Sequence, residues 1–479
     1  MEILNPPVGP ILGLVTRHSA RLMCAIKPAE QKSKINCGWL RYKKLNDTWS
    51  SPRRFRFNKA FHNTGVIELT QLEQGCCYEY QIAYESSYSE ADINDVEGIW
   101  QEITIHKFNT RGDGDELNFC FGSCMRNNGQ EQVGKTLRQV DELHQSSPLD
   151  MMLWLGDQVY NDKYLGLTLN NSAKDAFTEL YDDFFGNTYV QKIIPNMPNY
   201  MVMDDHEIED SFTDGATAYA NTKFNWFNKD IDRLINGINA FYSYQLSHGP
   251  IYDTAPDVNQ DGVAFIKGQA NNQVPVKHYA TVDLGDTGLF LMDTRKERSS
   301  NGLISSEQEQ ALEAFLSSHH RVKLIASSVT FLADNDLAAE KADNWKRAEQ
   351  QRARILNYIM SKGIKNVVFL SGDVHSHFAA SLRYRGEDTS VYQLVSGSIF
   401  WPTSFLINSI RWFEKDVQFG KAIHGAEEFS LSNPISCNDN KFYASNGIGH
   451  VTISGGELKF KVINKSGEVV IDATLPLDV

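Results

Sequence analysis

The pattern of apolar positions changes character near residue 115. Before that point, short segments alternate apolar and polar residues and are rich in β-branched and aromatic side chains, which is typical of half-buried strands. The clearest of these segments are ARLMCAI (20–26), INCGWLRY (35–42), TGVIELT (64–70) and CYEYQIAY (77–84). We therefore predict an all-β region over residues 10–110.

From about residue 116, continuous apolar runs alternate with helical stretches. Continuous hydrophobicity indicates strands that are covered on both faces, as in α/β folds. The runs are LNFCFGSC (117–124), MMLWLGD (151–157), NYMVMDDHE (199–207), GLFLMDTR (288–295), VKLIASS (322–328), NVVFLSGDVH (366–375) and VYQLVSG (391–397). Helices are predicted over 303–318 with a Ser N-cap, over 344–363 ending at Gly363, and around 235–246. Residues 447–470 read as paired strands, and residues 253–275 as a polar loop.

The length of 479 residues exceeds what one core supports, so we expect two domains, an all-β one over 1–112 and an α/β one over 113–479. The net charge is −14. Residues 1–112 hold 14 Lys+Arg and 12 Asp+Glu, or +2, which leaves −16 for the remainder. A broad nucleic-acid-binding surface is not expected, because phosphate backbones require clustered basic side chains.

No window of the sequence is long and apolar enough to span a membrane. The N-terminus lacks the basic segment of a signal peptide, so we expect a cytoplasmic protein unless the chain is a processed form. The seven cysteines have no framework spacing. Most of them are expected to be buried thiols, although a pairing of Cys24 or Cys37 with Cys76 or Cys77 stays open.

Chemically active side chains follow five of the apolar runs. Because sites in α/β sheets form beyond the carboxyl ends of the strands, these side chains can converge although some 250 residues separate them. Taken alone, each has a simpler explanation as a turn aspartate, a core histidine or a helix cap. The side chains are Cys124, then Asp157 and Tyr160, then Asp204, Asp205, His206 and Asp210, then Asp293 and Arg295, then Asp373, His375 and His377.

Together these groups indicate a metal site. Four or more carboxylates gathered without a cation would repel one another and raise one another's pKa, whereas bound metal ions would offset that repulsion. Oxygen ligands mixed with imidazole and phenol suit iron, manganese, zinc or calcium better than copper.

The motifs FGSC, LGDQVYND, DDHEIED, LMDTRKER and LSGDVHSHFAASL, in this order, resemble those of the alkaline phosphatase D (PhoD-like) family. That family consists of metallophosphatases with an N-terminal β-sandwich. The resemblance implies a fibronectin III/Ig-like sandwich over 1–112 and a layered αββα phosphatase domain over 113–479. The GDxxY pattern is also similar to that of the purple acid phosphatases, in which the tyrosine binds ferric iron.

Carried over residue by residue, the resemblance implies a set of metal ligands and two catalytic groups. Asp157 would be a primary or bridging ligand, Tyr160 and Cys124 ligands of ferric iron, and Asp205 a metal ligand. Asp373 and His375 would complete the shell of a second metal, calcium in this family, with zinc and manganese as other candidates. His206 would contact the leaving oxygen, and Arg295 would clamp the phosphate. Asp210 stands where many members have asparagine, and as a ligand it would add negative charge. Asp204 and His377 would lie behind the ligands.

The resulting hypothesis is metal-dependent hydrolysis of phosphate mono- or diesters by a metal-activated hydroxide, with a small phosphate ester as substrate. The choice between monoesters and diesters would depend on a wall or lid, for which residues 213–275 are the candidates. Two alternatives remain open, another metallohydrolase and a non-enzymatic binding protein with a degenerate metallophosphatase domain. No HExxH motif is present, which disfavours a zinc peptidase.

Overall fold

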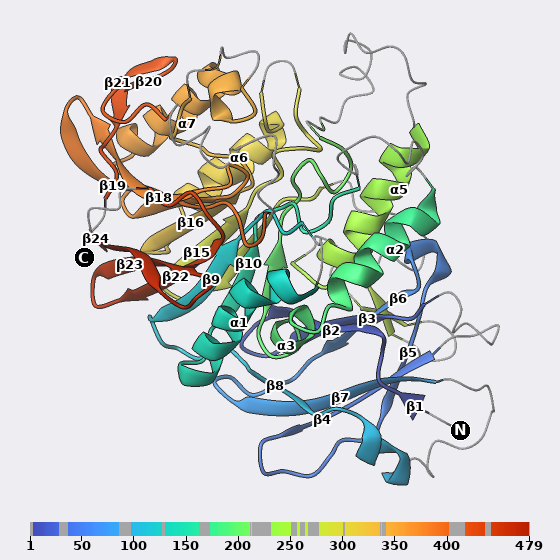
Figure 1. The fold of residues 1–479 in the computed structure, drawn as a ribbon. Coiled ribbons are helices and arrows are strands. Elements are labelled where there is room, and N and C mark those ends of the chain that lie inside the picture. The colour runs from blue at the N-terminus through green and yellow to red at the C-terminus, as the bar shows by residue number, and fades with distance from the viewer. Residues whose placement is uncertain are drawn as a thin grey trace. The chain divides into compact units, whose positions relative to one another are not determined.

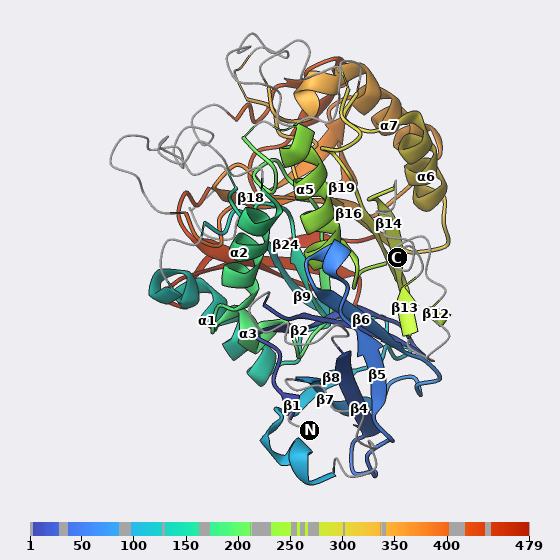
Figure 2. The same ribbon diagram turned by 90° about the vertical axis from the view of Figure 1, so that its right-hand side faces the viewer.

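A computed structural model shows two groups of sheets and helices (Figures 1 and 2). It describes residues 3–27, 37–85, 97–126, 130–161, 173–210, 212, 231–250, 256–258, 264–266, 277–299, 302–335, 337, 342–401, 417–435 and 442–478. The first compact unit comprises Met1–Asp113, Leu169–Tyr200 and Asp232–Lys277, and the second comprises Gly114–Thr168, Met201–Ile231 and His278–Val479.

The first unit contains two sheets that share one core. A seven-stranded sheet holds β1 (Ile3–Leu4), β7 (Cys77–Glu85), β4 (Cys37–Lys44), β5 (Arg53–Arg56), β13 (Ala264–Ile266), β12 (Pro256–Val258) and, paired with β7, β8 (His106–Asn109). A three-stranded sheet holds β2 (Val8–Val15), β3 (Ala20–Ala25) and β6 (Thr64–Leu69). Leu22 and Ile67 of the smaller sheet and Leu40, Phe55 and Ile82 of the larger one belong to the same buried cluster. The described part of residues 10–110 therefore consists of strands and loops with two short 3-10 helices, Lys59–Phe61 and Glu97–Glu102.

Three helices join this unit, although they lie beyond the boundary predicted at residue 112. They are α2 (Lys174–Phe185), α3 (Val190–Ile193) and α5 (Ile231–Phe241), which runs into a π-helical turn over Tyr242–Leu246. The amide of Leu12 donates to the Ile194 carbonyl at 2.9 Å, and the amide of Leu14 donates to the His248 carbonyl at 2.8 Å. These buried backbone bonds satisfy edge groups of β2, so the helices cluster with the strands rather than with the second unit.

The second unit contains two larger sheets. The first has the strand order β11 (Asn199–Met201), β10 (Met151–Trp154), β9 (Leu117–Gly122), β22 (Gly447–Ser454), β23 (Glu457–Asn464) and β24 (Val469–Pro476). The second has the order β14 (Ala280–Leu284), β15 (Thr287–Leu291), β16 (Val322–Ser327), β17 (Val367–Ser371), β19 (Glu387–Ser396), β18 (His377–Tyr384), β21 (Ala426–Leu431) and β20 (Ala422–Ile423). Strands β9 and β10 are parallel, and so are β15, β16, β17 and β19.

The two sheets of the second unit pack on each other, and helices cover their outer faces. Gly449 of β22 donates its amide to the Ser396 hydroxyl of β19 at 2.9 Å, so the sheets approach closely there. Helix α1 (Gln130–Ser146) contacts β22 and β23, whereas α6 (Ser306–Leu316) and α7 (Glu349–Ser361) contact the other sheet (Figure 1). The predicted N-cap is present, since the Ser305 hydroxyl accepts a hydrogen bond from the Gln308 amide.

Several smaller predictions can also be compared with the structure. The six cysteines that the structure describes are free thiols, and Cys437 lies outside the described residues. The predicted polar loop over 253–275 contains the short strands β12 and β13, and its remaining residues, like most of 213–275, lie outside the described part. None of the described helices is both long and apolar enough to cross a bilayer.

Candidate metal centre

The polar residues that follow β9, β10, β11 and β17 lie close together, and Arg295, which follows β15, contacts two of them. The loops after β9 and β17 are joined by two bonds: the Asp373 amide donates to the Ser123 hydroxyl at 3.0 Å, and the Cys124 thiol lies 3.5 Å from the Asp373 carbonyl. The loops after β9 and β10 are joined by backbone bonds from Cys124 to Gly156 and from Met125 to Asp157. These hydrogen bonds bring together the carboxyl ends of strands from both sheets.

Asp157 contacts several other members of the cluster. Its side chain is buried, and its Oδ2 accepts from the Tyr160 hydroxyl at 3.1 Å and lies 3.5 Å from the Cys124 thiol. Its Oδ1 accepts from the His206 amide at 3.3 Å. The phenol and the thiol thus both contact one buried oxygen atom of the Asp157 carboxylate. These three side chains are the ones predicted to surround iron.

Two groups of side chains have the spacing of a metal site. One is Asp157, Asp205 and His206, and the other is Asp157, Asp204 and Asp373; in each, one ligand atom per residue lies within 4.8 Å of the others. Asp157 belongs to both groups. The Asp204 Oδ2 atom is buried and has no hydrogen-bond partner among the described residues. A buried carboxylate oxygen without a donor is costly unless a cation lies beside it, so Asp204 fits a ligand role better than the supporting role expected for it.

The backbone is held in an unusual conformation at four of the predicted ligands. Cys124, Asp157, Asp373 and His375 have φ angles of 56°, 57°, 64° and 49°. Non-glycine residues seldom adopt this left-handed region, and each costs about 1–3 kcal/mol unless its surroundings enforce it. Gly156 also has a positive φ, and a Cβ there would meet the Asp204 side chain. The surrounding structure therefore enforces this backbone conformation at the predicted ligands.

Glu207 accepts hydrogen bonds from the two loops that carry Asp157 and Asp204, and it was not among the residues predicted from the sequence. It is buried; its Oε2 accepts from the amides of Asp157 at 3.1 Å and Asp204 at 2.9 Å, and its Oε1 accepts from the Gln158 amide at 2.9 Å. Burial raises the pKa of Glu207 to about 7, although the three amide donors oppose that shift. Its position directly after the DDH triplet is the feature of the sequence that could have identified it.

Without cations the cluster is electrostatically strained. Burial, followed by the neighbouring carboxylates, raises the pKa values of Asp157 and Asp373 well above the ordinary range, while the His206 imidazole opposes the shift at Asp157. Burial raises the pKa of Asp204 to about 6, against the opposing effect of Arg295. Burial also raises the pKa values of the Cys124 thiol and the Tyr160 phenol. Such a site holds protons when empty and would release them on binding a cation.

Arg295 is paired with carboxylates. Its side chain is fully buried, its Nε donates to Asp204, and its two terminal nitrogens donate to Asp343 at 2.9 and 3.0 Å. Arg298 also pairs with Asp343. These contacts already engage the guanidinium fork, which favours a role in balancing the charge of Asp204 over the phosphate clamp predicted for Arg295.

The three remaining predicted residues occupy different positions. His375 lies beside the cluster, and burial lowers the pKa of its imidazole to about 3, which keeps it neutral. Asp210 is exposed and belongs to neither of the two groups, so the structure does not support it as a ligand. His377 is buried, hydrogen bonds to Ser396 and to the Ser445 carbonyl, and belongs to neither ligand group.

Four rings border the carboxylates and are named here the aromatic wall: Tyr160, His206, His375 and Trp401. The Tyr160 and His206 ring centroids are 4.3 Å apart, those of Tyr160 and Trp401 5.4 Å, and those of His375 and Trp401 4.0 Å. Trp401 was not anticipated, because a single tryptophan after a strand carries no motif.

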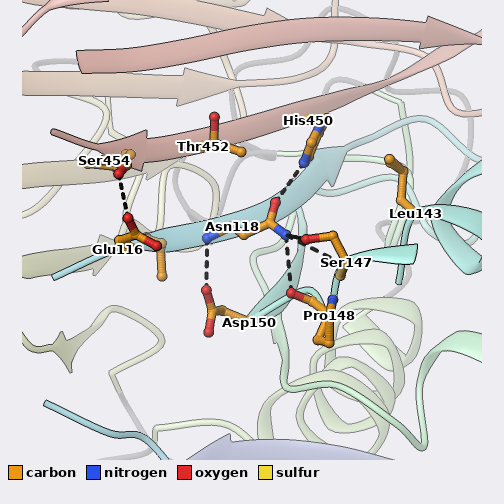
Figure 3. A pocket seen from close by; sticks show the side chains of 11 residues that line it. Glu116, Asn118, Leu143, Ser147, Pro148, Asp150, His450, Thr452 and Ser454 are labelled. Atoms are coloured by element: carbon orange, nitrogen blue, oxygen red, sulfur yellow. Dashed lines mark hydrogen bonds between the residues drawn. The ribbon is translucent and has the colours of Figure 1, made fainter. Parts of the chain in front are cut away.

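A separate pocket of about 440 Å³ lies at the opposite end of β9 (Figure 3). Asn118, at its centre, accepts from His450 at 2.7 Å and donates to the Ser147 hydroxyl at 3.2 Å and the Pro148 carbonyl at 3.1 Å. Six residues of extended chain separate Asn118 from Cys124, or roughly 20 Å. The pocket is therefore distinct from the metal cluster, and its bonds tie together the ends of three strands.

We expect Asn118→Ala to lower the free energy of unfolding by roughly 1 kcal/mol, because it removes the hydrogen bonds to the half-buried His450 and to the exposed Ser147 and Pro148. Urea titration measures the effect. Thr452→Ala, in the same pocket, is the control and should change stability by less than about 0.5 kcal/mol. Equal effects of the two substitutions would show that the Asn118 bonds do not stabilise this end of the sheet.

Comparison with known proteins agrees with this geometry. Alkaline phosphatase D of Bacillus subtilis (strain 168) is 24% identical over 298 residues, which cover 57% of this chain and 48% of that protein, so the match spans about half of the relative's length. A solved structure of PhoD has a TM-score of 0.68 at 16% identity and covers 98% of this chain and 90% of that one. The purple acid phosphatase PPD1 of yellow lupin (Lupinus luteus) has a TM-score of 0.58 at 11% identity, covering 98% of this chain and 74% of that one.

At these identities the two structural likenesses establish the fold, a mixed α/β arrangement that this chain shares with both phosphatases. The family itself is shown by the sequence model for PhoD-like phosphatases, which matches residues 119–416. That range includes every residue of the two candidate metal groups. The chain belongs to the PhoD-like phosphatase family.

Proposed function

We propose that the protein hydrolyses phosphate esters with the help of bound metal ions. The observation that carries the proposal is the position of Asp157, which belongs to both groups of potential metal ligands. A carboxylate shared in this way can bridge two cations. Phosphate esters are suitable substrates for such a site because paired cations can hold both the attacking and the departing oxygen. The curated relative is named as a phosphatase, which agrees with this reaction class.

The donor atoms fit two kinds of metal. Cys124 and Tyr160, both within 3.5 Å of Asp157 Oδ2, offer a soft thiolate and a phenolate, which suit ferric iron. Asp204, Asp205, Asp373 and His375 offer oxygen and imidazole donors, which suit calcium, or zinc or manganese in its place. The unpartnered Oδ2 of Asp204 supports the presence of a cation on that side.

When bound, the metals would supply positive charge and acidify a water molecule at neutral pH. The chain's own groups then orient and balance this site. His206 belongs to the first ligand group, and we assign its imidazole to the protonation of the departing oxygen rather than to a cation; its amide donates to Asp157 and its ring packs on Tyr160. Arg295 holds Asp204 in place and reduces the repulsion between it and Asp205. Glu207 fixes the loops that carry Asp157 and Asp204.

We also infer the finer architecture. In the second unit, α1 lies on one sheet, the two sheets pack on each other, and α6 and α7 lie on the other sheet, which supports the αββα arrangement of metallophosphatases. In the first unit, two sheets with a shared core support a sandwich of the fibronectin III/Ig kind. The substrate would be a small phosphate mono- or diester.

The test is hydrolysis of p-nitrophenyl phosphate and bis(p-nitrophenyl) phosphate by the purified protein before and after dialysis against a chelator. We expect activity on at least one of the two esters, loss of more than about tenfold on chelation, and recovery when iron and calcium are returned together. Activity that survives complete removal of metal would contradict the metal-dependent reaction. Absence of activity in a protein with its full metal content would favour a binding protein.

A further inference from the structure

Trp401 is the member of the aromatic wall that the proposed chemistry does not use. Its ring stacks on the His375 imidazole at an interplanar angle of 26° and lies near Tyr160. It therefore borders both sides of the cluster, the phenol side and the imidazole side. Because the Tyr160 hydroxyl donates to Asp157, Trp401 is separated from the cluster by one ring.

The position of Trp401 is set by its backbone. The Trp401 amide donates to the Asn446 Oδ1 at 2.8 Å, and the Asn446 Nδ2 donates back to the Trp401 carbonyl at 3.3 Å. The preceding residue, Phe400, forms a parallel bridge with Met125. Ile399 and Phe400 are buried, whereas Trp401 is only half-buried. A large aromatic side chain held rigidly yet partly exposed is typical of a recognition surface rather than of a core.

Arg126 adds a cation to this surface. Its guanidinium carbon lies 5.6 Å from the centroid of the Trp401 ring, within the range of a cation–π contact. Its amide donates to the Phe400 carbonyl at 3.0 Å, so the same bridge that holds Trp401 holds Arg126. Unlike Arg295, Arg126 is partly exposed. A flat cation and a flat ring are thus presented together beside the cluster.

We propose that Trp401 and Arg126 form the subsite for the organic group of the substrate, and that this subsite favours a flat aromatic group over an aliphatic one. The inference rests on the proposed phosphate ester hydrolysis. An aryl ring or a nucleobase can pack against the exposed part of the indole and stack on the guanidinium plane, and such packing tolerates many ring types because every ring has a π-face. An aliphatic alcohol offers no comparable face. Trp401 is thereby a specificity-determining residue.

The experiment measures binding by calorimetry with two ligands that cannot be hydrolysed, phenylphosphonate and methylphosphonate. The wild-type protein, as purified with its metals, should bind phenylphosphonate at least tenfold more tightly. Trp401→Ala should weaken phenylphosphonate binding by about tenfold, or about 1.4 kcal/mol, and leave methylphosphonate binding within about twofold. Trp401→Phe, which keeps a ring, should retain most of the preference.

Trp49→Ala is the matched control, because Trp49 is also half-buried and packs against an arginine, Arg41, at 4.5 Å. It should change neither affinity. Equal affinities of the wild type for both phosphonates, or an equal loss of both in Trp401→Ala, would overturn the subsite while leaving ester hydrolysis standing. If the wild type bound neither phosphonate yet hydrolysed esters, only the subsite would fail. If it also hydrolysed no ester, the proposed function would fail with it.

Discussion

Asp157→Asn is expected to reduce kcat/KM for phosphate esters by about 10³-fold or more, equivalent to at least about 4 kcal/mol of transition-state stabilisation. Asp157 belongs to both candidate ligand groups and is in contact with Cys124 and Tyr160. The amide cannot replace a bridging carboxylate, because one of its two donor atoms is lost and its charge is removed. Steady-state kinetics and elemental analysis of the same preparation measure the effect, and both activity and metal content should fall.

The stability of the metal-free protein distinguishes this loss from unfolding. The raised pKa of Asp157 keeps that side chain protonated when no cation is bound, so the amide replaces a neutral group of the same shape and the melting temperature of metal-free protein should change little. Asp210→Asn is the control: it removes an exposed carboxylate from the same loop as Asp205, outside both groups, and should keep metal and activity within about twofold. If Asp157→Asn retained metal and activity, the assignment of Asp157 would be wrong.

Glu207→Gln is expected to weaken metal binding by about 10–100-fold, as is usual when a group that orients metal ligands is changed. The carboxylate accepts from three backbone amides, of Asp157, Gln158 and Asp204. A glutamine has one acceptor oxygen, so its amino group would face at least one of these N–H donors. Unfolding stability should fall by about 1–3 kcal/mol as well. Titration of metal-free protein with iron or calcium, followed by calorimetry, measures the affinity.

Glu297→Gln provides the matched control for Glu207. Glu297 also accepts several hydrogen bonds, from the Ser305 amide at 3.1 Å, the Ser305 hydroxyl at 2.7 Å and Gln308, but it belongs to neither ligand group. Because all three bonds reach its Oε2 atom, which a glutamine oxygen can replace, this variant should lose little stability and no metal affinity. Should Glu207→Gln bind metal as tightly as the wild type, Glu207 would have a purely structural role.

Much of the second unit could be predicted because its strands are marked by continuous apolar runs that end abruptly in polar groups. The runs ending at Cys124, Asp157 and Asp373 each form a strand, β9, β10 and β17, and each delivers its polar group to the same place. Convergence followed from the general rule for the carboxyl ends of strands.

What could not be predicted depends on contacts between residues far apart in the chain. Arg295 was expected to be open to substrate, because nothing near it in sequence announces its bidentate partner Asp343. The boundary predicted at residue 112 leaves out the later helices that join the first unit. One contact that joins them is the hydrogen bond from the Tyr80 hydroxyl to the Pro195 carbonyl at 2.7 Å. Trp401 and Glu207 likewise gain their importance only from packing.

We propose that Asp157 lies between two metal sites, one of them an iron site with Cys124 and Tyr160. The most direct measurement is X-ray diffraction from crystals of the protein as purified, with anomalous data collected on both sides of the iron absorption edge. We expect an iron peak in contact with all three side chains and a second metal peak in contact with Asp157 and Asp373. A map with no metal density at Asp157, in protein that hydrolyses phosphate esters, would contradict it.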